Sequence, residues 1–568
     1  MFVPKLVTTL KDYSREQFLR DATAGMIVGV VALPLCIAFA IASGVSPDRG
    51  LYTGIVGGLL ISLLGGSRVQ IGGPTGAFVV IVYGIVQRYG VEGLTVATLM
   101  AGVFLVIMGV AKLGVALRFI PFPVVTGFTS GIALIIFSSQ VKDFLGLAMG
   151  DVPAEFFEKW AAYARHVGSI NWYAAGLASL TLAILVLWPR LGARAAKVPA
   201  PFVALIVTGA LAVLLDLPVE TIGSRFGAID ASFPRPVLPR LAFADVTALV
   251  GPALTIAMLA AIESLLSAVV SDGMIGARHR SNMELVANGI ANIASPLFGG
   301  IPATGAIART ATNVKSGGRT PVAGIVHALT LLAITLFFGR FAALIPMATL
   351  AGILAMVAYH MSEWRIFRSE LRAPRSDAAV LVTTFLLTVV VDLTVAISVG
   401  MVLAAFLFMR RMAEVTDVRY VTRQLADGVE RVDDPNALAL RDVPREVEVY
   451  EIDGPFFFGA AERFKDTVGQ VSRKPKVLII RLRDVPAIDS TGLHALREVA
   501  RRARHEGTLF LLSDVRAQPL VALGRSTLLD EIGEENIFGH IDDALERAKE
   551  HLGLPGTTTK PDLTTVGS

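Results

Sequence analysis

The chain has 568 residues, of which 54% are hydrophobic and only 17% are charged. Soluble globular proteins carry roughly 25% charged residues, so this composition excludes an ordinary soluble protein and indicates a membrane protein. The net charge of +4 is small, and the basic residues lie in short clusters beside apolar runs, which argues against nucleic acid as a partner.

Long stretches without Asp, Glu, Lys or Arg recur between Ala24 and Met409, for example at 23–47, 69–87 and 320–339. At a rise of about 1.5 Å per residue, such stretches cross most or all of a hydrocarbon core about 30 Å thick. We predict about fourteen hydrophobic segments, and therefore an all-α polytopic membrane domain at 23–412. A cytoplasmic segment at 1–22 would precede it.

Basic clusters mark the predicted cytoplasmic ends of these segments, as at Arg410 and Arg411. An even number of spans then places both termini in the cytoplasm of a multi-pass protein of the inner membrane.

A glycine-rich segment occurs once in each half of the hydrophobic region, as GGPTGA at 72–77 and GGIPATGA at 299–306. Paired Gly/Pro breaks of this kind point to a transporter's binding site. Each break must line a cavity or be buried in protein, and the helix that follows it directs its free N–H groups into that cavity. Two such helix N-termini would form an anion site.

Thr75 and Thr304 stand at the ends of these breaks. Their hydroxyls would cap the two helices or bind the anion. The alternative is that the breaks are tolerated kinks and the threonines serve only as caps.

Two charged residues interrupt the apolar region. Glu263 is the only charge in a run of about twenty residues, and Arg309 follows Thr304 by five residues. Ionisable residues inside a membrane are functional hypotheses by default. Arg309 would add positive charge to the anion site, or would form a structural ion pair.

Glu263 would gain and lose a proton during transport, or would be held ionised by a fixed salt bridge with Arg309; the residues leave both open. Ser264 and Ser267 lie on nearby faces of the same segment and could supply further hydroxyls.

The character of the chain changes after Arg411. A linker at 413–440 leads to strands at 447–452, 476–482 and 508–513 that alternate with helices, which predicts a small α/β domain with a mostly parallel sheet at 441–553. The polar tail at 554–568 is predicted to be disordered. The sequence contains no metal-ligand spacing, phosphate-binding loop or nucleophile elbow, so we expect no metal, no cofactor and no enzymatic activity.

Several stretches resemble the SulP (sulphate permease) family of anion transporters with a C-terminal STAS domain. They include SGVSPDRGLYTG, GGSRVQIGGPTGAFVVIVYG, AIESLLSAVVSDGM and FGGIPATGAIARTATNVKSGG. The resemblance covers nearly the whole chain. It implies two inverted seven-helix repeats divided into core and gate bundles, a homodimer, and an anion site between two short helices, with Glu263 beside the anion. The expected substrate-binding residues are Thr75, Gly76, Ala77, Thr304, Gly305, Ala306, Ile307 and Arg309.

Within that family the chain looks most similar to proton-linked carriers of C4-dicarboxylates. Many sulphate-type members carry Pro-Gln in the first helix, where this chain has Pro34-Leu35. We therefore expect proton-coupled uptake of succinate, fumarate or aspartate. The alternatives are bicarbonate or sulphate transport coupled to sodium or protons, and a membrane-anchored sensor whose STAS domain signals to a cytosolic protein.

Ser490 lies in DSTGL, at a strand-to-helix turn of the predicted STAS domain. The family's anti-sigma-antagonist relatives can be phosphorylated at the matching serine, which would make Ser490 regulatory. It could equally be the N-cap of the helix.

Overall fold

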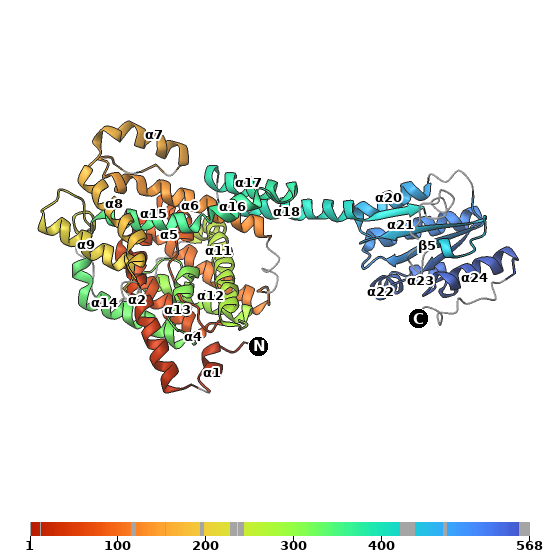
Figure 1. Cartoon of the computed structure of the whole chain (residues 1–568), viewed down its shortest axis with the longest axis horizontal. Helices are drawn as coiled ribbons and strands as arrows, with labels where there is room; N and C mark the ends of the chain where they lie inside the picture. The colour runs from red at the N-terminus through yellow and green to blue at the C-terminus, as the bar shows by residue number, and fades with distance from the viewer. Residues whose placement is uncertain are drawn as a thin grey trace. The chain divides into compact units, whose positions relative to one another are not determined.

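The computed structural model divides into two units, Met1–Ala404 and Ala405–Ser568 (Figure 1). It describes residues 2–555 except 12, 115–120, 151, 154, 193–197, 228–235, 237–242, 392, 421–437 and 470–473. Most of the predicted linker and nearly all of the predicted disordered tail lie outside the described residues, so the domain limits at 412 and 440 stay predictions.

The first unit is almost entirely helical. Its first half contains α1 (Lys5–Thr9), α2 (Arg15–Ala42), α3 (Pro47–Tyr52), the π-helical turn η1 (Thr53–Gly57), α4 (Gly58–Leu64), β1 (Gly72–Gly73), α5 (Gly76–Val110), α6 (Phe122–Leu145), α7 (Phe156–His166), η3 (Val167–Ser169), α8 (Trp172–Leu187), η4 (Trp188–Leu191), α9 (Ala200–Leu214) and α10 (Ile222–Phe226). Its second half contains α11 (Phe243–Ile275), α12 (Ser281–Leu297), β2 (Thr304–Gly305), α13 (Ile307–Lys315), α14 (Val322–Ala342), α15 (Met347–Met361), α16 (Trp364–Glu370), α17 (Arg375–Val390) and the first part of α18 (Leu393–Val415), which continues past Ala404.

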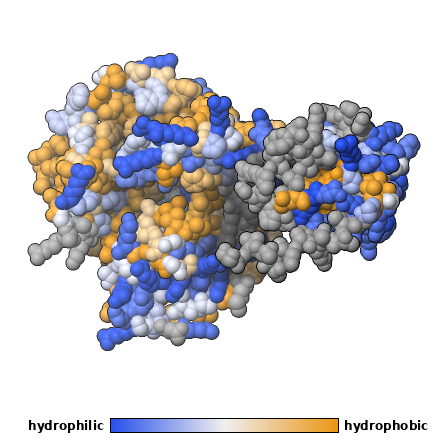
Figure 2. Space-filling model, turned by 45° about the vertical axis from the view of Figure 1, so that its right-hand side comes forward, coloured by the Kyte–Doolittle hydropathy of each residue, from blue (hydrophilic) through white to orange (hydrophobic). Residues whose placement is uncertain are grey.

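Among the described residues, seven helices are long and apolar enough to cross a membrane. The first of them, α2, begins at Arg15, so it includes part of the segment 1–22 that we expected to precede the transport domain. Figure 2 shows broad hydrophobic areas on the surface of the helical unit, as lipid contact requires.

The second half of the described membrane unit repeats the order of the first. In each half a long helix and a shorter helical segment precede a two-residue strand, and another helix begins two or three residues after the strand ends. α5 counts as two segments because its backbone leaves the helical conformation at Gly90, where φ is 67°. With α5 divided, the described helices fit the predicted arrangement of fourteen segments in two sevens.

The helices form two groups by their packing. α5 packs mainly on α11 and α12, and α2 on α14, whereas α6 packs on α15 and α17. Glycines allow the closest approach in the first group, because a Cβ added at Gly102 of α5 would lie 2.7 Å from the carbonyl oxygen of Gly289 in α12. These groups correspond to the predicted core and gate bundles.

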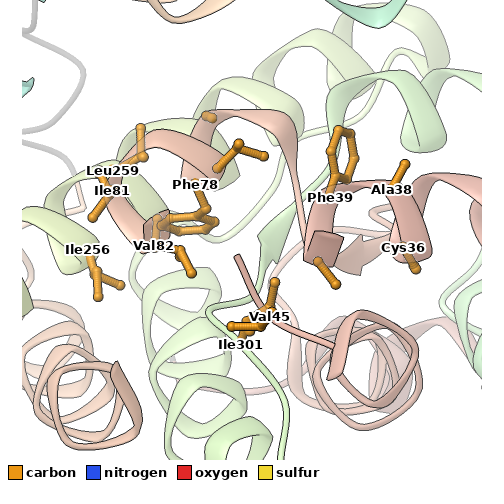
Figure 3. Packing of buried hydrophobic residues seen from close by; sticks show 14 of the residues in the cluster. Cys36, Ala38, Phe39, Val45, Phe78, Ile81, Val82, Ile256, Leu259 and Ile301 are labelled. Carbon is orange, nitrogen blue, oxygen red and sulfur yellow. The ribbon is translucent and has the colours of Figure 1, made fainter. Parts of the chain in front are cut away.

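A continuous apolar cluster fills the interior around the two short strands. Figure 3 shows Phe78 and Val82 of α5 near Ile256 and Leu259 of α11, with Phe39 of α2 beyond them. Burial of these side chains holds α5, α11 and α2 together behind the ends of β1 and β2.

The second unit contains the α/β domain. Its elements are β3 (Asp417–Tyr420), η6 (Leu438–Leu440), β4 (Val447–Asp453), α20 (Phe458–Gly469), β5 (Val477–Asp484), α21 (Ser490–Glu506), β6 (Leu509–Ser513), α22 (Ala517–Arg525), α23 (Leu528–Ile532), η7 (Glu534–Asn536) and α24 (Ile541–Leu552). The sheet order is β3-β4-β5-β6, with β3 antiparallel to β4 and the other pairs parallel. This confirms the predicted fold class; β3 was not predicted.

Candidate functional site

The two glycine-rich breaks meet in the middle of the membrane unit. β1 and β2 pair antiparallel, with Gly72 opposite Gly305 and Gly73 opposite Thr304. The amide of Ala306 donates to the carbonyl of Ile71 at 2.8 Å and extends this pairing. The two strands satisfy each other's backbone groups, which lipid could not do.

A helix begins two or three residues after the end of each strand. Thr75 precedes the first residue of α5, and Ala306 precedes the first residue of α13. Neither helix start receives a side-chain cap. The first turn of α13 is open, since Ile307 is 42% exposed. Uncapped N–H groups at two adjacent helix starts produce a region of positive potential without any basic side chain.

Glu263 reaches this point from α11. Its Oε2 accepts a hydrogen bond of 2.6 Å from the Thr75 hydroxyl, and its side chain is only partly buried. The carboxylate therefore lies beside the start of α5, where the helix dipole favours negative charge.

Arg309 lies on the inner side of α13 and is 2% exposed. Its guanidinium donates to the carbonyl of Pro74, and its Nη1 lies 3.8 Å from the sulfur of Cys36 in α2. The charge of Arg309 thus lies next to the paired residues of β1 and β2 (72–73 and 304–305), which we call the β1–β2 crossing.

Glu263 and Arg309 are both described, and no salt bridge joins them. The expected alternative of a fixed ion pair between these two residues is therefore wrong for this conformation. Each has a different hydrogen-bond partner, Thr75 for Glu263 and the carbonyl of Pro74 for Arg309.

Three predicted hydroxyl donors are already engaged. Thr304 is fully buried and donates to the carbonyl of Ala260, and its expected role as a helix cap is wrong because Ala306 is the N-cap of α13 and no side chain caps this helix. Ser264 and Ser267 are also buried; Ser264 accepts from Gln70, and Ser267 donates to Thr310. The hydrogen bonds of these residues connect α11 to β2, to the residue that leads into β1, and to α13.

Thr75 does not act as a cap either. The interpretation of Thr75 as only a helix cap fails because its hydroxyl bonds to Glu263 and no backbone amide of α5 donates to it.

Gly76 lies where the two helix groups meet. A Cβ at this position would lie 3.2 Å from Cδ1 of Ile136 in α6, 3.3 Å from Cε1 of Phe39 in α2 and 3.5 Å from the sulfur of Met361 in α15. The start of α5 therefore has an apolar surround contributed by both groups. Ala77 and Ala306 are buried beside it, and Gly305 lies within β2.

Sequence reasoning missed two residues behind the site. Gln70 donates to Ser264, and Glu284 is a fully buried carboxylate in α12 that accepts from the amides of Gly66 and Ser67. Glu284 follows the basic residues Arg278 and Arg280 closely in the sequence, and no local pattern marks it as buried.

In the α/β domain the N-cap of α21 is Asp489, whose side chain accepts from the amide of Gly492 at 2.8 Å. The interpretation of Ser490 as the N-cap is therefore wrong. Ser490 is the first residue of the helix and is exposed, and its phosphorylation stays a prediction.

The sequence of each unit matches a known protein family or domain. Residues 18–384 match the sulfate permease family, and residues 441–544 match the STAS domain.

Among full-length relatives, the chain is 42% identical to the putative sulfate transporter YvdB of Bacillus subtilis, over 94% of this chain and 98% of that protein. It is 30% identical to the bicarbonate transporter BicA of Picosynechococcus, over 93% and 94% of the two chains.

A solved structure of the murine Solute Carrier 26 family member A9 anion transporter superposes with a TM-score of 0.85 at 19% identity, covering 97% of this chain and 94% of that one. At this level of identity the likeness extends to the fold.

Proposed function

The chain belongs to the sulfate permease family, and we propose that it is a secondary transporter that binds a small anion at the crossing of β1 and β2. The observation that carries this proposal is the adjacency of two uncapped helix N-termini with the buried charge of Arg309 behind them. Backbone N–H groups and helix dipoles bind anions of varied shape, and a cation fixed nearby strengthens the attraction.

For the substrate, we propose a small oxyanion, with sulfate and bicarbonate as the first candidates. Relatives that bear these names align over more than nine-tenths of the chain. A helix start recognises such ions through several N–H donors at once.

C4-dicarboxylates are the second candidate. Leu35, which stands where many sulphate-type members carry glutamine, is partly buried against the apolar core and offers no hydrogen bond. A leucine in place of glutamine removes a polar partner for sulfate and is compatible with a ligand that has a hydrocarbon centre between two carboxylates.

Glu263 is the proposed coupling residue. Its carboxylate bonds to Thr75, the residue before the start of α5, and this bond links its charge to the binding segment. We further propose that the protein is a homodimer of the inner membrane with both termini in the cytoplasm, and that the STAS domain regulates transport through a cytosolic partner.

Counterflow in proteoliposomes tests the function. Vesicles that contain the purified full chain are loaded with unlabelled sulfate, bicarbonate or succinate and are diluted into the same labelled anion, with and without proton and sodium gradients. Exchange of at least one of these anions is expected, and a gradient that drives accumulation identifies the coupling ion. Failure of all three to exchange, with folded protein in the vesicles, would contradict the proposal.

A further inference from the structure

A buried polar network lies behind the β1–β2 crossing, with the Ser264 hydroxyl at its centre. The side-chain amides of Gln70 and Asn288 each donate to this hydroxyl oxygen at 2.6 Å. Both lone pairs of the oxygen then accept hydrogen bonds. The hydroxyl itself donates to Oε1 of Glu284, with 3.4 Å between the two oxygen atoms. All four side chains are at most 4% exposed.

Glu284 anchors the network to the chain that leads into β1. Its Oε2 accepts from the amides of Gly66 and Ser67, at 2.7 and 2.9 Å. Among the described residues no cation lies within salt-bridge distance of this carboxylate, which is held by neutral donors instead. These two bonds hold the carboxyl group of Glu284 against the turn at Gly66 and Ser67, shortly before Gln70 in the sequence.

Gln70 connects the network to both strands. It directly precedes Ile71 and β1, and its side chain lies across β2: a Cβ added at Gly305 would fall 1.8 Å from Nε2 of Gln70. One side chain therefore touches α11, adjoins β1 and covers β2.

The network does not resemble one that merely stabilises the fold. Oε1 of Gln70 and Oδ1 of Asn288 are buried and have no hydrogen-bond partner among the described residues. A buried unpaired oxygen reduces stability, so an apolar side chain of the same shape at position 70 would serve folding at least as well.

We propose that Gln70, oriented by Ser264 and Glu284, is a positioning residue that sets the β1–β2 crossing and thereby the distance between the two helix starts that hold the anion. The inference rests on the proposed transport function. Gln70 does not itself contact the anion; it acts through the backbone of β1 and β2.

The test compares Gln70→Met with wild type, in counterflow and in thermal unfolding of the purified full chain. Methionine keeps the length of the side chain and loses both polar atoms. The inference predicts a KM raised about fivefold to tenfold, the effect of one misplaced hydrogen bond, with Vmax within about twofold and Tm unchanged or raised. A structural role predicts the reverse, with lower Tm and Vmax at an unchanged KM.

Ser264→Ala removes the hydroxyl to which Gln70 and Asn288 donate, and it should raise KM in the same way. This variant replaces Gln70→Met in the test if Gln70→Met does not fold. Ser271→Ala is the matched control, because Ser271 is buried on the same helix and bonds only to the carbonyl of Ala268. An unchanged KM in Gln70→Met, with wild type active, overturns the inference alone. A wild type that exchanges none of sulfate, bicarbonate and succinate overturns the proposed function instead.

Discussion

The Thr75 hydroxyl donates to the Glu263 carboxylate at 2.6 Å, which ties the start of α5 to the middle of α11. The bond joins a carboxylate of α11 to the residue that precedes a proposed anion-binding helix. An ionised Glu263 only accepts hydrogen bonds and accepts one from Thr75, whereas a protonated Glu263 can also donate one. Protonation of Glu263 on α11 therefore changes the hydrogen bonding of Thr75 at the start of α5.

Glu263→Gln should separate exchange from coupling. Glutamine keeps the shape of the carboxyl group and can still accept from Thr75 through its amide oxygen, but it cannot ionise. We expect self-exchange of the anion to continue and accumulation driven by a pH gradient to be lost. Exchange and gradient-driven uptake are measured on the same vesicles.

Thr75→Ser is the control, because it keeps the hydroxyl that bonds to Glu263. Gradient-driven accumulation by Glu263→Gln at the wild-type level would end the proton-coupling role. Parallel loss of stability, binding and exchange would instead assign Glu263 a structural role.

Arg309→Ala should weaken anion uptake at least tenfold, because a buried charge behind the site is removed. The structure adds a cost in stability: the Pro74 carbonyl loses its charged donor, which is worth about 1–3 kcal/mol. Arg309→Lys keeps the charge but not the planar fork and should recover only part of the uptake. Labelled-anion uptake and Tm are measured together, and wild-type uptake by Arg309→Ala would refute the role.

Gly102→Ala should destabilise the membrane unit by about 1–3 kcal/mol, because the added methyl meets the backbone of α12 at Gly289 and Ile293. Gly84→Ala is the matched control on the same helix, since nothing lies within 4 Å of its added Cβ. It should be neutral or stabilising by about 0.5–1 kcal/mol. Thermal unfolding in detergent compares the two, and equal stability would contradict the close α5–α12 contact.

A chain that ends at Thr416 should still bind the anion. It keeps β1, β2, α5, α11 and α13, and the two described charged residues of the site, Glu263 and Arg309, belong to α11 and α13. It loses the contact between the Thr416 hydroxyl and the Pro455 carbonyl, together with the whole α/β domain. We expect unchanged binding with slower turnover or lower stability. Binding of labelled anion to the folded truncated protein checks this, and its complete loss would place part of the site in the STAS domain.

The breaks at the centre of the fold were predictable because two glycines followed closely by proline disfavour a helix, and this combination occurs as Gly-Gly-Pro in the first half and as Gly-Gly-Ile-Pro in the second. The main strands of the STAS domain were predictable for a similar reason, since short β-branched runs alternate with amphipathic helices. β3 was missed because Asp417–Tyr420 is short and half charged, and pairing with β4 rather than composition makes it a strand.

The site was harder to predict in detail. The sequence identified Thr75, Glu263 and Arg309, but it could not reveal that Thr75 bonds to Glu263 while Arg309 turns toward Pro74. Those choices depend on the antiparallel pairing of strands that are more than two hundred residues apart. The role of Glu284 is likewise set by a distant turn, and no local pattern marks it.

Counterflow of labelled anion by Gly76→Val, compared with wild type and Gly84→Ala, tests the location of the site most directly. The nearest side-chain atoms around an added Cβ are the ends of Ile136, Phe39 and Met361, the first and last of which can shift, so valine can be accommodated while it fills the space at the start of α5. If the anion binds at the β1–β2 crossing, exchange falls at least tenfold, while Gly84→Ala exchanges like wild type. Exchange at the wild-type rate by folded Gly76→Val protein would contradict the account, because the anion would then cross the membrane elsewhere.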